Sequence, residues 1–169
     1  MSLIYKAYFH LYPCLKHHPI GNPEVPQLPQ RHPKVTYGRF DTVKRFVQEL
    51  RLAIIDEDPT EGIVVVEDEE RGLNNLVLNC DDPLLIFEQR ILDVPTPPGE
   101  LFRRLLQMNR TLVHGAFVLD EAGKSILLHD TLALAYVDLN EVQGTIDAFS
   151  LALAEYAREL IAFSRHGAG

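Results

Sequence analysis

The sequence lacks tryptophan, has only two cysteines and contains no long apolar run. Two cysteines, Cys14 and Cys80, are too few for the disulfide framework of a small secreted protein and favour a reducing cytoplasm. No stretch approaches the roughly 20 apolar residues of a membrane-spanning helix. Lys6 and His10 interrupt the apolar N-terminal run, and no small-residue cleavage site follows, so a signal peptide is not indicated. The sequence therefore predicts a soluble, cytoplasmic protein without a membrane partner.

What is present is the composition of a globular protein with an acidic body. The 169 residues suit a single domain, and 46% are hydrophobic. The net charge is −8, yet residues 1–37 carry +3, so the remainder carries −11. The charged residues of the first segment are Lys6, Lys16, Arg31 and Lys34 against Glu24. Because an acidic body repels phosphate backbones, we expect no nucleic-acid partner.

Prolines separate the N-terminal segment from the rest of the chain. Six of them lie between residues 13 and 33, at positions 13, 19, 23, 26, 29 and 33. Proline lacks an amide donor and favours extended backbone, so this segment is neither a helix nor a central strand. We expect an N-terminal arm over residues 1–36 and one domain over 37–165. The aromatic residues near its start (Tyr5, Tyr8, Phe9 and Tyr12) would dock on a sheet edge or a neighbouring subunit; a poorly ordered terminus is the alternative.

The first part of the domain predicts a helix followed by three strands. After Asp41 as N-cap, Val43, Phe46, Val47, Leu50 and Ile54 fall on one side of a helix that ends before Pro59. Short apolar runs at 63–66, 76–78 and 84–87, the last continuing through 91–92, are typical of strands. Their short connections favour antiparallel pairing, because a parallel pair needs a long crossover.

The second part predicts a helix, a hairpin and a long final helix. Thr96 as cap and Pro97 in the first turn begin a helix that ends near Asn109. Strands at 115–119 and 124–128 form a hairpin, and a helix over 139–163 follows. Asp138 and Glu141 have the spacing of a capping box. The predicted fold is α+β, with the order α-β-β-β-α-β-β-α and an antiparallel five-stranded sheet packed by helices.

Tests for chemistry give no catalytic, cofactor-binding or metal site. Gly123-Lys124-Ser125 is similar to the end of a phosphate-binding loop, but the first glycine is missing and a strand follows. Residues His10, His17, His18 and His32 lie near Cys14 in the arm, while His114 and His129 flank the hairpin and could face each other. The proline-rich arm could not preorganise a metal site, and the adjacent His17 and His18 lack the spacing that aims ligands at one ion. No Cys, Asp or Glu plainly converges on His114 and His129.

Nucleophilic catalysis has no local motif in this chain. Cys80 precedes Asp81-Asp82, whose charge would raise the thiol pKa, and no serine has an esterase-type context. A triad of distant residues is the alternative that a sequence alone leaves open. We predict a protein that is not an enzyme.

Acidic residues gather between positions 56 and 70, which hold eight of the 24 acids. They lack the spacing and the glycine of a calcium-binding EF-hand loop. A solvated turn is the simpler interpretation, and a docking place for a basic partner segment is the alternative.

Two local segments resemble a known fold family. The first is Asp81-Asp82-Pro83-Leu84-Leu85-Ile86-Phe87-Glu88-Gln89, and the second is Leu105-Leu106-Gln107-Met108-Asn109-Arg110 leading to Gly115-Ala116-Phe117-Val118-Leu119-Asp120. With the element order, residues 38–164 resemble the type III secretion chaperone-like fold of Tir-type (CesT-like) chaperones and YbjN-like proteins, nearer the latter. The resemblance implies a bacterial, non-enzymatic protein that forms dimers and binds protein segments; YbjN-like members are linked to regulation.

The hairpin strands are apolar on both faces, which indicates burial on both sides. We therefore predict a partner or dimer surface. Its members would be Phe102, Leu105, Leu106, Phe117, Leu119 and Leu127. The leading hypothesis is a chaperone-like or adaptor homodimer, without a cofactor, that holds a segment of a partner protein. The alternative is a YbjN-like regulatory or sensory-transduction protein without a stable client.

Overall fold

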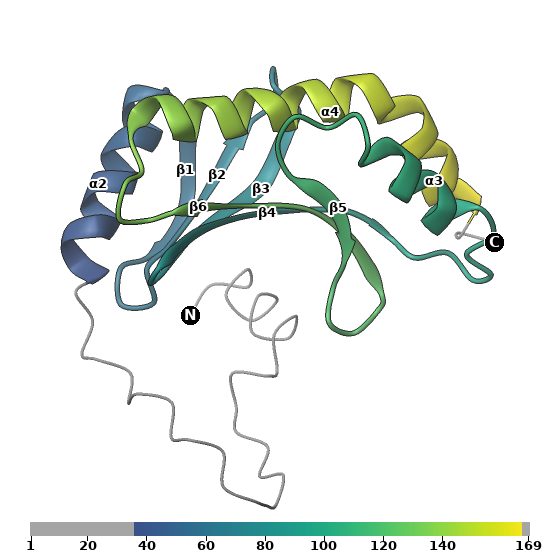
Figure 1. The fold of residues 1–169 in the computed structure, drawn as a ribbon, viewed down its shortest axis with the longest axis horizontal. Coiled ribbons are helices and arrows are strands. Elements are labelled where there is room, and N and C mark those ends of the chain that lie inside the picture. Colours follow the sequence, from purple (N-terminus) through teal and green to yellow (C-terminus); the bar gives the residue numbers. More distant parts are fainter. Residues whose placement is uncertain (1–35, 167–169) are drawn as a thin grey trace, which may run out of the picture.

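The computed structural model describes residues 36–166, which form one antiparallel sheet with helices (Figure 1). Predictions about the N-terminal arm, including Cys14 and its neighbouring histidines, lie outside these residues. The elements are α2 (Thr36–Glu49), β1 (Ala53–Asp58), β2 (Ile63–Asp68), β3 (Leu73–Asp81), β4 (Leu84–Asp93), α3 (Leu101–Met108), β5 (Ala116–Leu119), β6 (Ser125–Ala133) and α4 (Leu139–His166).

The sheet has six strands in the order β1-β2-β3-β4-β6-β5, and each neighbouring pair is antiparallel. This arrangement confirms the α+β fold class and each of the five predicted strands. The predicted count of five strands is wrong, because β1 was assigned to the end of the first helix. Ile54 therefore lies in a strand, although its spacing from Val47 and Leu50 fits a helix.

Helix α2 ends early because its last turn closes in a Schellman motif. The amide of Leu52 donates to the carbonyl of Val47 at 3.1 Å, and that of Arg51 to Gln48 at 3.0 Å. Arg51 has a left-handed φ of 58°, a conformation in which glycine is the usual residue. The side chains of Val47 and Leu52 are both buried in the core, in line with the hydrophobic contact that frequently accompanies this motif.

The two later helices differ in how well their starts were predicted. Helix α3 begins after Glu100 without a side-chain cap, so Thr96 is not its N-cap. Gly99 has a left-handed φ of 54°, and a helix cannot run through that conformation. At α4 the capping box is confirmed. The amide of Glu141 donates to Asp138 Oδ1 at 2.9 Å, and the amide of Asp138 to Glu141 Oε2 at 3.3 Å.

All three described helices lie on the same face of the sheet (Figure 1). Phe87 of β4 meets Phe149 of α4 edge-on at 6.5 Å between ring centroids, and Phe117 of β5 meets Tyr156 at 6.4 Å. Strand residues that alternate with Phe87 point to the other side, which we call the helix-free face. Ile63 and Val65 lie there; they are buried but stand outside the main core cluster. None of the described helices combines the length and apolarity that a bilayer crossing needs.

Candidate binding groove

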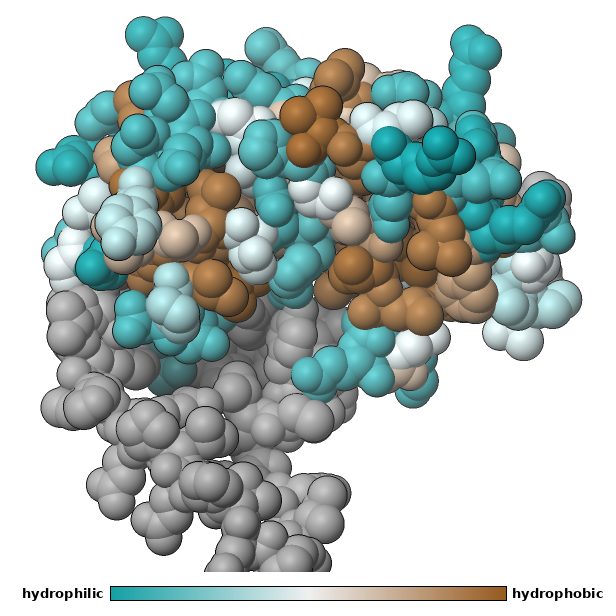
Figure 2. Space-filling view, viewed as in Figure 1, coloured by the Kyte–Doolittle hydropathy of each residue, from teal (hydrophilic) through white to brown (hydrophobic). Residues whose placement is uncertain are grey.

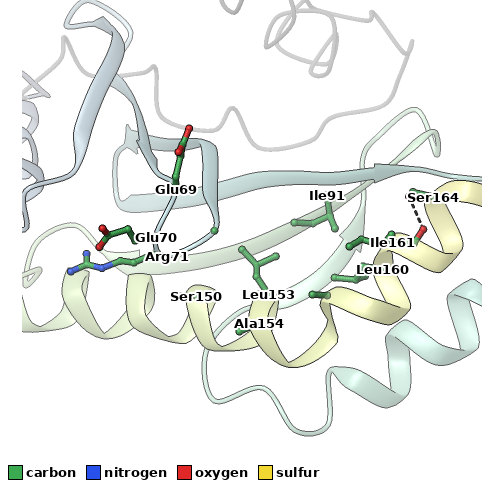
Figure 3. Close-up of a pocket in the computed structure, with 12 residues that line it drawn as sticks. Glu69, Glu70, Arg71, Ile91, Ser150, Leu153, Ala154, Leu160, Ile161 and Ser164 are labelled. Atoms are coloured by element: carbon green, nitrogen blue, oxygen red, sulfur yellow. Dashed lines mark hydrogen bonds between the residues drawn. The ribbon is translucent and has the colours of Figure 1, made fainter.

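An open groove of about 440 Å³ runs between the C-terminal half of α4 and the turn that joins β2 to β3 (Figure 3). Ile91 of β4 and Leu153 and Leu160 of α4 form its floor. Ile161 also lines it and is 50% exposed, so apolar surface remains in contact with solvent. Exposed apolar surface of this kind gains free energy when another apolar group covers it.

The α4 side of the groove carries small side chains at helical spacing. Ser150, Ala154, Ala157 and Ser164 all line the groove and recur every three, four or seven residues, which places them along one side of the helix. Small side chains let the backbone of another segment come close to a helix. The hydroxyl of Ser164 is already occupied, since it donates to the carbonyl of Ile161 at 2.8 Å.

The opposite wall is the turn between β2 and β3, which is fixed by several hydrogen bonds. Asp68 Oδ1 accepts from the amide of Arg71 at 3.2 Å, and the amide of Gly72 donates to the carbonyl of Glu69 at 3.1 Å. Buried Gln89 donates from Nε2 to the carbonyl of Gly72 at 3.2 Å. Its Oε1 has no hydrogen-bond partner among residues 36–166.

The rim of the groove at this turn is acidic. Glu69 and Glu70 are exposed and lie at one end of the apolar floor (Figure 3). The neighbouring Arg71 pairs with Asp68 through Nε and Oδ2 at 3.6 Å, so these two charges offset each other. An apolar floor beside an acidic rim suits a segment that presents apolar side chains and a nearby lysine or arginine.

The six residues of the predicted partner surface lie in different environments. Leu105 and Phe117 belong to the buried core, Phe102 is half-buried against it, and Leu127 is buried outside that core cluster. Leu106 and Leu119 are exposed, at 70% and 46%. Figure 2 shows that apolar side chains reach the surface in several patches between hydrophilic ones. A contact of these six residues with a partner stays a prediction.

The two histidines that flank the hairpin, His114 and His129, pair with different carboxylates. His129 Nδ1 lies 3.0 Å from Glu88 Oε1, and the hydrogen bond to this carboxylate raises the pKa of His129. His114 Nδ1 lies 3.7 Å from Asp130 Oδ2. They are therefore engaged with carboxylates. Over residues 36–166, no three side chains of the metal-binding types converge.

The remaining chemical candidates have structural roles. Burial raises the pKa of the Cys80 thiol to about 12, so burial dominates over the adjacent carboxylates that the sequence suggested. In the loop of the β5–β6 hairpin, Asp120 Oδ1 accepts from the amides of Lys124 and Ser125 at 2.6 and 3.0 Å. This confirms that Gly123-Lys124-Ser125 belongs to a hairpin.

Sequence reasoning identified only part of this groove. The acidic residues at 56–70 were interpreted as a solvated turn, with a docking place for a basic segment as the alternative, and the α4 wall was missed. A signal was present, since Ser150, Ala154 and Ala157 interrupt an apolar helix at spacings of four and three. Only the fold shows that Ile91 and the turn at 69–72 lie opposite these small side chains.

Comparison with known proteins gives a family and a fold. The family model described as CesT_Tir_1 matches residues 37–166. No curated protein matches the sequence. The structure is similar to the crystal structure of YbjN, a putative transcription regulator from E. coli, with a TM-score of 0.57 and 14% identity over 71% of this chain and 92% of YbjN.

A second similar structure comes from the HopA1–SchA chaperone–effector complex. The TM-score is 0.52 and the identity 11%, over 79% of this chain and 99% of that one. At these identities the likeness concerns the fold alone. It matches the resemblance found in the sequence.

Proposed function

This chain belongs to the CesT_Tir_1 family of type III secretion chaperone-like proteins, and from that premise we propose that it is a non-enzymatic protein that holds a segment of a partner protein. The groove beside α4 is the observation that carries the proposal. It offers apolar side chains to solvent next to two exposed carboxylates, Glu69 and Glu70. That combination supports binding of a polypeptide segment.

The form of the bound segment follows from the walls of the groove. Small side chains at Ser150, Ala154 and Ala157 admit a closely packed helix or strand, and Leu153 and Ile161 supply apolar contacts. Apolar residues on one side of the segment would meet this floor, in the manner of a helix in a groove. A basic residue beside Glu70 would set the orientation and raise the association rate at low salt.

The proposal includes a homodimer in the cytoplasm. Self-association is supported by the family resemblance and by the 28-residue length of α4, which exceeds what the small domain needs. Light scattering should then give a molar mass near twice the 19.2 kDa of one chain. A measured molar mass of 19.2 kDa would contradict the homodimer but would not contradict binding of a partner segment in the groove.

A regulatory role without a stable client is the alternative. It is favoured by the likeness to YbjN, whose structure is described as that of a putative transcription regulator. The acidic body does not favour direct contact with DNA, so regulation would act through another protein or a small ligand. Recovery of the chain without any near-stoichiometric protein would support this alternative.

The test is capture from an extract of the source organism, with three tagged chains. They are the wild type, Ala154→Glu in the groove, and Ala162→Glu on an exposed position of α4 outside the groove. We expect one near-stoichiometric protein with the wild type and with Ala162→Glu, and at least a tenfold loss with Ala154→Glu. Equal capture by all three chains, or capture by none, would contradict the proposal. Circular dichroism checks that both variants are folded.

A further inference from the structure

The helix-free face of the sheet is a second apolar surface, separate from the groove. Because directly paired residues of antiparallel strands share a face, the register places Val65 beside Val77 and Ile86 beside Thr131. Phe87, which alternates with Ile86, points to the helices. The apolar residues of the helix-free face include Ile63, Val65, Val77, Ile86, Val118 and Leu127.

Acidic side chains surround this apolar centre. Asp56 pairs with Val65 in the register and therefore lies on the same face, and Glu67 and Asp81 follow Val65 and Asn79 by two residues on their strands. The basic Arg90 on this face is bonded to Asp93 and Ser125. The face therefore fits an occupant that is apolar and positively charged.

One segment of the chain itself has this composition. Residues 1–35 carry a net charge of +3 and contain apolar and aromatic side chains near their start. These are Leu3, Ile4, Tyr5, Tyr8, Phe9 and Tyr12. The six prolines disfavour pairing as a further strand, because proline has no amide to donate. Contact with the sheet would therefore be made by side chains.

Position and length also suit this segment. Thr36 begins α2 at the end of the helix nearer the helix-free side of the sheet (Figure 1). An extended proline-rich segment of 35 residues reaches about 110 Å, while six strands at about 4.8 Å spacing are only about 25 Å wide. Ile63 and Val65 are buried, although the described helices pack on the opposite face.

We propose that residues 1–35 cover the helix-free face of their own chain. The apolar and aromatic side chains pack on the strip around Val65, Val77 and Ile86, and the basic residues lie near Asp56, Glu67 and Asp81. The face is then unavailable to a second copy or to a partner while the segment is in place. This inference is independent of the groove, which lies on the helix side of the sheet.

Photo-crosslinking of the full-length chain tests this arrangement. Thr131→p-benzoylphenylalanine and Ala133→p-benzoylphenylalanine place the probe at two exposed positions on the helix-free face. Leu151→p-benzoylphenylalanine, exposed on α4, is the matched control on the other side. Mixing light and heavy isotope-labelled chains distinguishes crosslinks within one chain from those between copies.

We expect peptides from residues 1–35 to be linked to both helix-free probes within the same chain, with at least tenfold lower yield for the control. Replacing Lys6, Lys16, Arg31 and Lys34 by glutamate in the probe-carrying chains should lower the yield at least threefold. The inference would be overturned by crosslinks to a second copy, by crosslinks to other proteins only, by equal yields at 131 and 151, or by an unchanged yield after charge reversal.

Discussion

At the residue scale, Gly115 is a position where no other residue fits. Its φ is +73°, and a Cβ atom would lie 2.9 Å from both the carbonyl oxygen of His129 and a ring carbon of Phe149. The backbone of His129 and the ring of Phe149 cannot both move aside at low cost. A side chain at position 115 would therefore cause overpacking in addition to the strain of a left-handed backbone. The glycine thus allows the segment before β5 to pass close to β6 and α4.

Gly115→Ala should therefore destabilise the protein by at least about 2 kcal/mol in urea unfolding. Gly144→Ala is the matched control, because nothing lies within 4 Å of its added Cβ in helix α4. That change should stabilise the protein by about 0.5–1 kcal/mol. Equal changes in the free energy of unfolding for the two substitutions would show that a Cβ atom at position 115 finds enough space.

The pair of His129 and Glu88 gives a pH dependence with a defined sign. The hydrogen bond to Glu88 raises the pKa of His129. The negative charges of Glu88 and Asp130 also raise it, by a smaller amount. The folded state then holds the proton more tightly than the unfolded chain, so the added stability is complete below pH about 6.5 and is lost as pH rises through the folded pKa.

Between about pH 6 and about pH 8.5, the wild-type protein should accordingly lose more free energy of unfolding than His129→Gln does. The difference should be no more than about 1 kcal/mol, because the His129 side chain is 34% exposed and solvent screens its charge. Urea unfolding at both pH values measures this difference. Parallel pH profiles for the two proteins would contradict the assignment.

At the element scale, Asn109 connects the end of α3 to β5. Its Oδ1 accepts from the amide of Phe117 at 2.8 Å, and its Nδ2 donates to the carbonyl of the same residue at 3.1 Å. The side chain pairs with β5 as a neighbouring strand would. This contact holds the helix and the edge strand together.

Asn109→Asp replaces the donor by an acceptor that faces the carbonyl of Phe117, and we expect a loss of about 1–3 kcal/mol in the free energy of unfolding. Asn140→Asp lies in the exposed first turn of α4, where a negative charge is neutral or slightly favourable. Chemical denaturation of both variants checks the expectation; a loss shared by both would rule out the role of the α3–β5 contact.

The elements were predictable where the sequence carries a repeated or local signal. Leu101 and Leu105, the capping residues Asp138 and Glu141, and the runs at 63–66 and 76–78 all lie in the elements they indicate. The end of α2 was not predictable, because Arg51 occupies a left-handed position without the glycine that normally reveals it. Strand β1 was consequently read as helix.

At the scale of the whole molecule, one sheet separates two surfaces. The groove lies with the helices, and the helix-free face lies on the other side. The groove was only partly predictable, since its walls come from residues 69–72, 91 and 150–164. Their meeting depends on how α4 crosses the sheet, and no local pattern specifies that crossing.

The central claim is that a partner segment is held in the groove. Hydrogen–deuterium exchange of the purified chain, with and without the captured partner, tests it most directly. The account predicts slower exchange on binding at residues 69–72 and 150–164, and loss of that protection in Ala154→Glu but not in Ala162→Glu. Unchanged exchange in both segments, or protection confined to the strands of the helix-free face, would contradict it.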